Sequence, residues 1–155
     1  MESHMKDNHY RHLLIMMILS FVAMYILMYA MVDIFSNVFP NCNQFYMAGL
    51  MSSPMLIIEL TVMGGMYKNK KLNAMLLGIG IMAMIGFWLL IRSQVGIADK
   101  QFLKSMIPHH AGALLMCEKA SIKDPEIKEL CRTIILGQQS EIAVMKQKLE
   151  ELKSK

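Results

Sequence analysis

The amino-acid sequence predicts an all-α protein in which three membrane-spanning helices precede a soluble helical hairpin. Hydrophobic residues make up 55% of the 155-residue chain. They are concentrated in three runs, each close to the roughly 20 residues with which a helix crosses a bilayer. The last third of the chain is instead rich in charge, and its apolar residues recur at the spacing of amphipathic helices.

Length and a near absence of charge define the predicted membrane spans. They cover residues 13–35, 44–67 and 72–91. Within residues 13–91 the only acidic side chains are Asp33 and Glu59, and the basic ones are confined to a short turn at 68–71. A polar loop at 36–43 separates the first two spans. The first run is longer than the apolar core of a signal peptide, which favours a span that is retained.

Lysine and arginine in the flanks predict the orientation, because cytoplasmic loops carry an excess of both. The N-terminal tail, residues 1–12, contains Lys6 and Arg11; the first loop has no basic residue and the second has three lysines. The tail and the second loop are therefore expected in the cytoplasm. Three crossings by the membrane region, residues 13–92, then place the hairpin domain, residues 98–155, outside it. Basic residues soon after the third span weigh against this orientation, but the balance favours it.

Two features of the spans allow both a structural and a functional interpretation. The chain holds 18 methionines, and Met47, Met51 and Met55 recur at helical spacing. A packing stripe of flexible side chains is the default explanation, and a ladder of soft thioether ligands for Cu(I) is the alternative. Glu59, expected near mid-bilayer, is either protonated and hydrogen-bonded to a serine or tyrosine, or part of a cation path.

The hairpin is expected to consist of a helix over residues 98–120, a turn at 121–123 and a second helix. Asp124 followed by Pro125 is typical of a helix start, with an N-cap and then proline at the first helical position. One face of the first helix is expected to carry Phe102, Met106, His109, Ala113, Met116 and Ala120. One face of the second is expected to carry Ile127, Cys131, Ile134, Gln138, Ile142, Met145, Leu149 and Leu152.

Soft donor side chains gather in this hairpin and suggest a metal site. The candidate ligands are Met106, His109, His110, Met116, Cys117 and Met145. Imidazole, thioether and thiolate groups suit Cu(I) or Ag(I) better than Mg²⁺ or Ca²⁺, which prefer oxygen. In the alternative interpretation, the histidines cap a helix bent at Pro108 while the sulfur side chains fill the core. The spacing leaves open whether Cys117 and Cys131 form a disulfide.

Two motifs in the hairpin resemble the DUF305 family. The first is Asp99-x-x-Phe102, then Met106-Ile107-Pro108-His109-His110 with Ala113 and Met116; the second is Asp124-Pro125, then Ile134-Ile135 and Gln138-x-x-Glu141-Ile142-x-x-Met145. The resemblance covers residues 98–152 and implies a membrane-anchored, ferritin-like hairpin that binds Cu(I) or Ag(I) outside the bacterial cytoplasm. It implies ligands at Met106, His109, His110, Met116 and Met145. The sequence departs from the family pattern at Ala111, where glutamine is common, and at Cys117, where alanine is usual.

We therefore expect a protein of the bacterial inner membrane that binds monovalent copper or silver, for tolerance or for delivery. Its expected partners are membrane lipid and either a second copy of the chain or a metal-efflux protein. The net charge of +4 does not form one basic stripe, so no nucleic-acid partner is expected. The chain lacks a Ser-His-Asp set and a phosphate-binding loop, so we expect no enzyme. The alternatives are a structural oligomerisation module and a component of metal transport.

Overall fold

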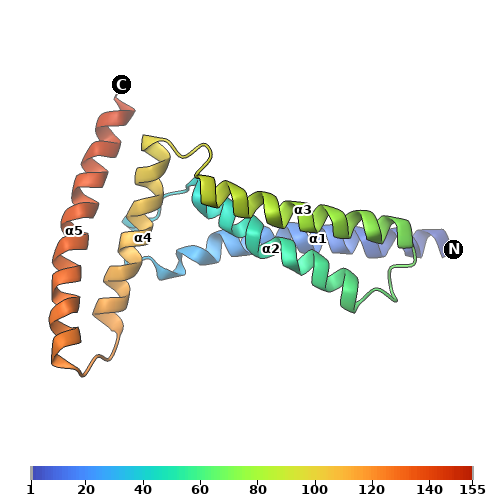
Figure 1. Ribbon diagram of the computed structural model, residues 1–155, viewed down its shortest axis with the longest axis horizontal. Helices are drawn as coiled ribbons and strands as arrows, with labels where there is room; N and C mark the ends of the chain where they lie inside the picture. Colours follow the sequence, from blue (N-terminus) through green and yellow to red (C-terminus); the bar gives the residue numbers. More distant parts are fainter. Residues whose placement is uncertain (1, 155) are drawn as a thin grey trace. The chain divides into compact units, whose positions relative to one another are not determined.

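The computed structural model of the chain describes residues 2–154, with side chains described from His9 onward, and it is entirely helical over that range (Figure 1). The α-helices are α1 (Glu2–Leu27), α2 (Cys42–Val62), α3 (Lys70–Ser93), α4 (Asp99–Lys119) and α5 (Pro125–Lys153). Two 3-10 helices, η1 (Met28–Met31) and η2 (Phe35–Asn37), lie between α1 and α2. The predicted all-α class is confirmed.

Three helical segments are long and apolar enough to cross a membrane, as predicted. They are His9–Met31, Cys42–Val62 and Lys70–Ser93. The second segment ends five residues earlier than expected, because Gly64 and Gly65 follow Met63 and glycine is a poor helix former. The chain turns there instead, with the Tyr67 backbone N–H donating to the Gly64 carbonyl at 3.3 Å.

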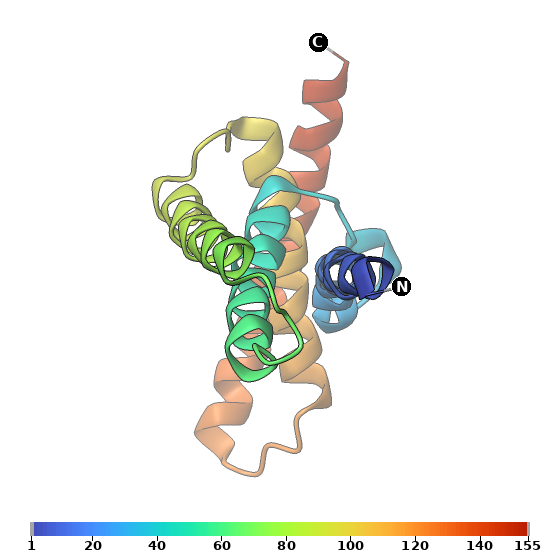
Figure 2. The ribbon, with the colours of Figure 1, turned by 90° about the vertical axis from the view of Figure 1, so that its right-hand side faces the viewer.

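The chain divides into two compact units, each described here by itself. The membrane unit comprises residues 2–27 and 43–95, and Figure 2 shows α1 (blue) nearly end-on, with α2 and α3 seen obliquely. The hairpin unit comprises residues 28–42 and 96–154. The hairpin unit thus includes the loop between the first two spans in addition to α4 and α5.

One phenylalanine from each helix joins an aromatic cluster in the membrane unit, in which Phe45 is 47% exposed and Phe21 and Phe87 are partly buried. The Phe45 ring of α2 lies 5.0 Å from the Phe21 ring of α1 and 6.3 Å from the Phe87 ring of α3, both edge to face. Offset and edge-to-face aromatic pairs contribute about 0.5–1.5 kcal/mol each beyond their buried area. Phe87 also lies over Gly49, where a Cβ would fall 2.4 Å from the ring. Glycine at position 49 is therefore a packing requirement between α2 and α3.

A polar network joins the three helices at one end of the membrane unit. The Tyr10 hydroxyl of α1 donates to Asn73 Oδ1 of α3 at 2.7 Å, and Asn73 Nδ2 donates to the Tyr67 carbonyl at 2.7 Å. The Tyr67 hydroxyl donates to Glu59 Oε1 at 3.0 Å. Glu59 lies one turn from the end of α2 and not at its middle, so the expected mid-bilayer position is wrong. The hydrogen bond to a tyrosine that one of the two alternatives for Glu59 expected is present.

The hairpin unit has a core of Ile107, Ala111, Leu114, Ile142 and Leu149, with Val32, Phe39, Leu103, Ile135 and Met145 packed against it. The face predicted for α5 is confirmed from Cys131 onward, where Ile142 and Leu149 are buried, but Ile127 at its start is 49% exposed. The face predicted for α4 is wrong by one residue: the side chains of Phe102 and Met116 are about half exposed, at 51% and 53%. The residues that follow the expected positions, such as Leu103 and Ile107, face the core instead.

Helix α4 continues through Pro108 without interruption. Proline has no backbone N–H, so the carbonyl of Lys104, four residues earlier, loses its usual helical donor. The Nδ2 of Asn41, buried in the loop before α2, donates to that carbonyl at 3.4 Å. A side chain from the first loop therefore replaces the hydrogen bond that the proline removes.

The start of α5 agrees with the sequence prediction. The Asp124 carboxylate accepts the backbone N–H groups of Glu126 and Ile127 at 2.9 and 3.0 Å, and Pro125 occupies the first helical position. Such a cap contributes about 1 kcal/mol. The cap determines where α5 begins and so contributes to the register of α5 against α4.

Candidate metal centre in the hairpin

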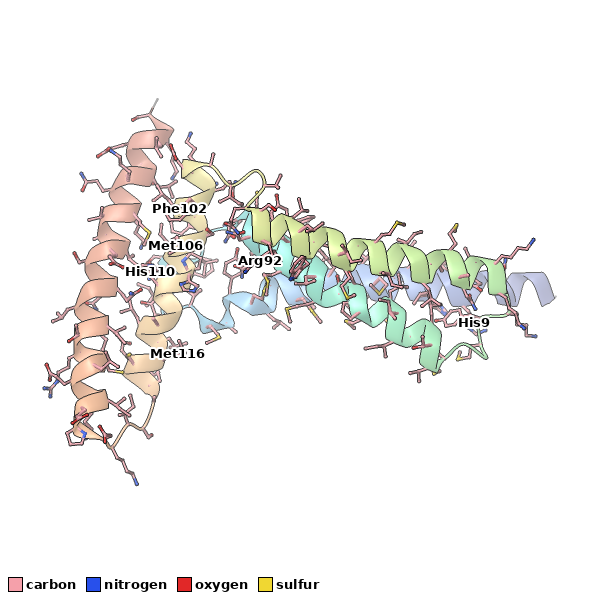
Figure 3. All side chains as sticks on the ribbon, viewed as in Figure 1. His9, Arg92, Phe102, Met106, His110 and Met116 are labelled. Atoms are coloured by element: carbon pink, nitrogen blue, oxygen red, sulfur yellow. The ribbon has the colours of Figure 1, made fainter. Side chains whose placement is uncertain are left out.

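Three of the six candidate ligands lie along one line of α4. Met106, His110 and Cys117 are spaced by four and then seven residues, which places them on the same side of a helix. This line is next to the core face of Ile107 and Leu114, and its side chains are partly buried. Figure 3 shows Met106 and His110 one turn apart on α4. We call Met106, His110 and Cys117 the donor line.

His110 is held by a carboxylate from α5. Its side chain is 14% exposed, and its Nδ1 lies 2.9 Å from Glu141 Oε2. The approach is short enough for an ion pair, but Nδ1 lacks an aligned hydrogen bond because the carboxylate lies off the ring N–H direction. The Glu141 side chain is 56% exposed, which leaves its carboxylate room to rotate toward the ring N–H. A carboxylate on one imidazole nitrogen leaves the other nitrogen as a potential ligand.

His109 and Met116 lie apart from the donor line. His109 is exposed, and its ring centroid is 6.0 Å from that of His110, with the planes tilted by 58°. Met116 is 53% exposed. Successive residues of a helix point about 100° apart, so neighbours in sequence face different directions. The paired histidines therefore do not converge as a pair, and the predicted six-residue set divides into two groups.

Contacts between α4 and α5 fix the register of the hairpin. Cys117 lies beside Cys131, and His110 lies beside Glu141. In an antiparallel pair the same register carries Met106 to the level of residues 142–145. Met145 packs against the core there.

Two residues absent from the predicted set, Cys131 and Glu141, contact the donor line. A hydrogen bond with Cys131, then burial, raises the pKa of the Cys117 thiol to about 11, so this thiol is protonated at neutral pH. Cys42, Cys117 and Cys131 are all free cysteines with partly buried side chains. In the sequence, Cys131 could have been identified by its place on the predicted α5 face. Glu141 could have been identified only by its position beside that face.

A site of histidine, cysteine and carboxylate ligands alone does not form. Over the part of the chain that the structure describes, no three or more such side chains converge as a metal would require. Met106 and Met145 are the two thioethers that the register brings to the level of His110 and its neighbours. That donor set has the softness expected for a monovalent coinage metal.

Comparison with known proteins places the hairpin in a family. A family model described as "Domain of unknown function (DUF305)" matches residues 59–149, which include α3 as well as α4 and most of α5. An uncharacterized protein of Acanthamoeba polyphaga mimivirus is 36% identical over 144 residues, covering 91% of this chain and 93% of the viral protein. No solved structure matches the chain. The chain therefore belongs to the DUF305 family.

Proposed function

We propose that the hairpin captures monovalent copper or silver, with Met106, His110 and Met145 as ligands. The observation that carries this proposal is the placement of His110: a partly buried imidazole, next to a thioether one turn away and fixed by Glu141 at 2.9 Å. Soft thioethers and one imidazole match Cu(I) and Ag(I), and they match Mg²⁺ and Ca²⁺ poorly. The role is storage or transfer of the ion, in tolerance or in delivery to a metal-efflux partner.

Glu141 orients the ligand rather than binding the metal in this proposal. A carboxylate on the second nitrogen of a metal-bound histidine fixes the ring and makes it a better donor, and its loss typically costs 10- to 100-fold in affinity. Cys117 lies two helical turns further along the donor line, beside Cys131. His109 and Met116 face away from this set and have no role in it.

A titration of the full-length chain in detergent tests the thioethers. Replacing both Met106 and Met145 by leucine keeps their volume and apolar character but removes both sulfur donors. Competition with a Cu(I)-specific chelator should show a loss of affinity of about 100-fold or more, as expected when donors are removed. Met116→Leu is the matched control and should bind like the unaltered chain. Equal affinity in the double variant would rule out this ligand set.

We also propose that the hairpin lies on the non-cytoplasmic side of its membrane. Loop residues 28–42 and the hairpin belong to one unit, so they share a side, and that loop contains no lysine or arginine. The turn after α2 contains Lys68, and α3 begins with Lys70 and Lys71, a basic cluster as found on the cytoplasmic side. The sequence resemblance implied a bacterial inner membrane, whereas the matched relative is viral. We therefore propose only the side of the membrane on which the hairpin lies, and not the kind of cell.

Reporter fusions in a bacterial host test this orientation. Alkaline phosphatase joined after residue 155 should be active, because it folds only after export, and green fluorescent protein there should stay dark. The same two reporters placed in the turn at 68–71 should give the opposite pattern and serve as the internal control. Fluorescence from the C-terminal fusion would contradict the proposed side.

A further inference from the structure

Two cysteines from different helices meet at the turn end of the hairpin core. Leu114 of α4 and Ile135 of α5 belong to the same packed core. Cys117 follows Leu114 by three residues, and Cys131 precedes Ile135 by four. Since residues three or four apart share a helix face, both cysteines extend this core by one turn toward the end of the hairpin.

Because Leu114 and Ile135 pack together, this spacing places the two cysteines side by side on the facing helices. The raised pKa of the Cys117 thiol, caused first by a hydrogen bond with Cys131, agrees with that placement. Each side chain is only partly buried, so a small reagent can reach it. The loop that joins the helices, residues 120–124, is short and is fixed by the Asp124 cap at its far end. Both cysteines therefore lie on regular helices close to the turn that joins them.

We propose that Cys117 and Cys131 form a redox-active dithiol, which a small disulfide such as oxidised glutathione converts into an intramolecular disulfide between α4 and α5. One cysteine loses its proton and attacks the disulfide of the oxidant, which releases one glutathione thiol and leaves a mixed disulfide. The second cysteine loses its proton and displaces the other glutathione. Two protein thiols are oxidised, and one glutathione disulfide is reduced to two thiols.

The oxidised state clamps the hairpin at its turn end and removes both thiols from further reaction. The Sγ–Sγ bond closes a ring over residues 117–131, so the two helix ends can no longer separate without breaking it. Because Cys117 lies on the donor line, oxidation also withdraws a soft donor from that side of α4. This oxidation is independent of metal binding, because it requires only the two thiols and a disulfide oxidant.

Peptide mapping of the full-length chain in detergent tests the pair. After incubation with oxidised glutathione, free thiols are blocked and the chain is cut by trypsin, which cleaves after Lys119, Lys123 and Lys128 and so separates the two cysteines. The peptides of Cys117 and Cys131 should remain joined, with a combined mass lower by about 2 Da for the hydrogens lost. Cys42, in another part of the chain, should instead gain one glutathione, about 305 Da.

Two variants make the outcome decisive. In Cys131→Ser, Cys117 should accumulate glutathione as Cys42 does, while Cys42→Ser should leave the joined peptides unchanged. Glutathione on both Cys117 and Cys131 of the unaltered chain would overturn the proposal. So would bonds between separate chains, or two unreacted thiols in a sample whose Cys42 is fully modified.

Discussion

Replacing His110 by alanine is expected to lower the affinity of the full-length chain for Cu(I) by about 100-fold, whereas His109→Ala should change it less than about threefold. The two residues are neighbours with the same chemistry, but only His110 is partly buried and contacts Glu141, at 2.9 Å. His109 is exposed on another face of α4. The measurement is a chelator competition under anaerobic conditions, with identical detergent and protein concentration for both variants.

The comparison between the two histidines distinguishes a site formed by the whole motif from a site formed by the donor line alone. A site made by the sequence motif as a whole would lose similar affinity in both variants, because the motif presents both imidazoles. A site made by the donor line loses affinity only when His110 changes. Glu141→Gln, which keeps the size of the side chain, should fall between them with a loss of about tenfold. Equal losses for the two histidines would contradict the assignment of His110.

The elements of this fold could be predicted from the sequence because local signals set them. The apolar runs gave the three spans, and Asp124 with Pro125 gave the start of α5. The first two spans end earlier than expected, at Met31 and Val62. Gly64 and Gly65 stop α2, and the first span continues past Leu27 only as a 3-10 turn. The pattern of apolar residues alone does not show that two adjacent glycines end the helix.

The side of α4 that packs against α5 could not be predicted, because the helix has two overlapping lines of apolar residues. One includes Phe102 and Met116, and the other includes Leu103 and Ile107. Which line packs on α5 depends on a third contact surface, the loop of residues 28–42. Val32 and Phe39 of this loop join the core, and contacts so distant in sequence leave no periodic signal.

The same long-range contacts explain why the candidate site was only partly predictable. The motif supplied the correct donor types, but the choice among them followed from the register of α4 against α5. Glu141 belongs to the second motif and lies beside the predicted α5 face, but nothing in the sequence indicates its contact with His110. Asn41 gave no signal at all, because its contact with the Lys104 carbonyl repairs a defect created by a proline 67 residues later in the chain.

Replacing Gly49 by alanine is expected to destabilise the membrane unit by about 1–3 kcal/mol, the usual cost of overpacking. The added Cβ would lie 2.4 Å from Cζ of the Phe87 ring, and the next two ring atoms are at 2.5 and 2.6 Å. A rigid ring cannot yield by bending its end, so either α2 and α3 separate or Phe87 changes rotamer. Both responses disturb the edge-to-face contact of Phe87 with Phe45.

Thermal or denaturant unfolding in detergent measures this effect, and Gly86→Ala of α3 is the matched control. A Cβ at Gly86 meets no atom within 4 Å, so the same chemical change adds helix propensity without a clash. The control should therefore be as stable as the unaltered chain or slightly more so. If both variants lose stability equally, the cause is a general intolerance of these helices to alanine and not the packing of Phe87 on Gly49. A loss of stability confined to Gly49→Ala shows that α2 and α3 pack together because position 49 has no side chain.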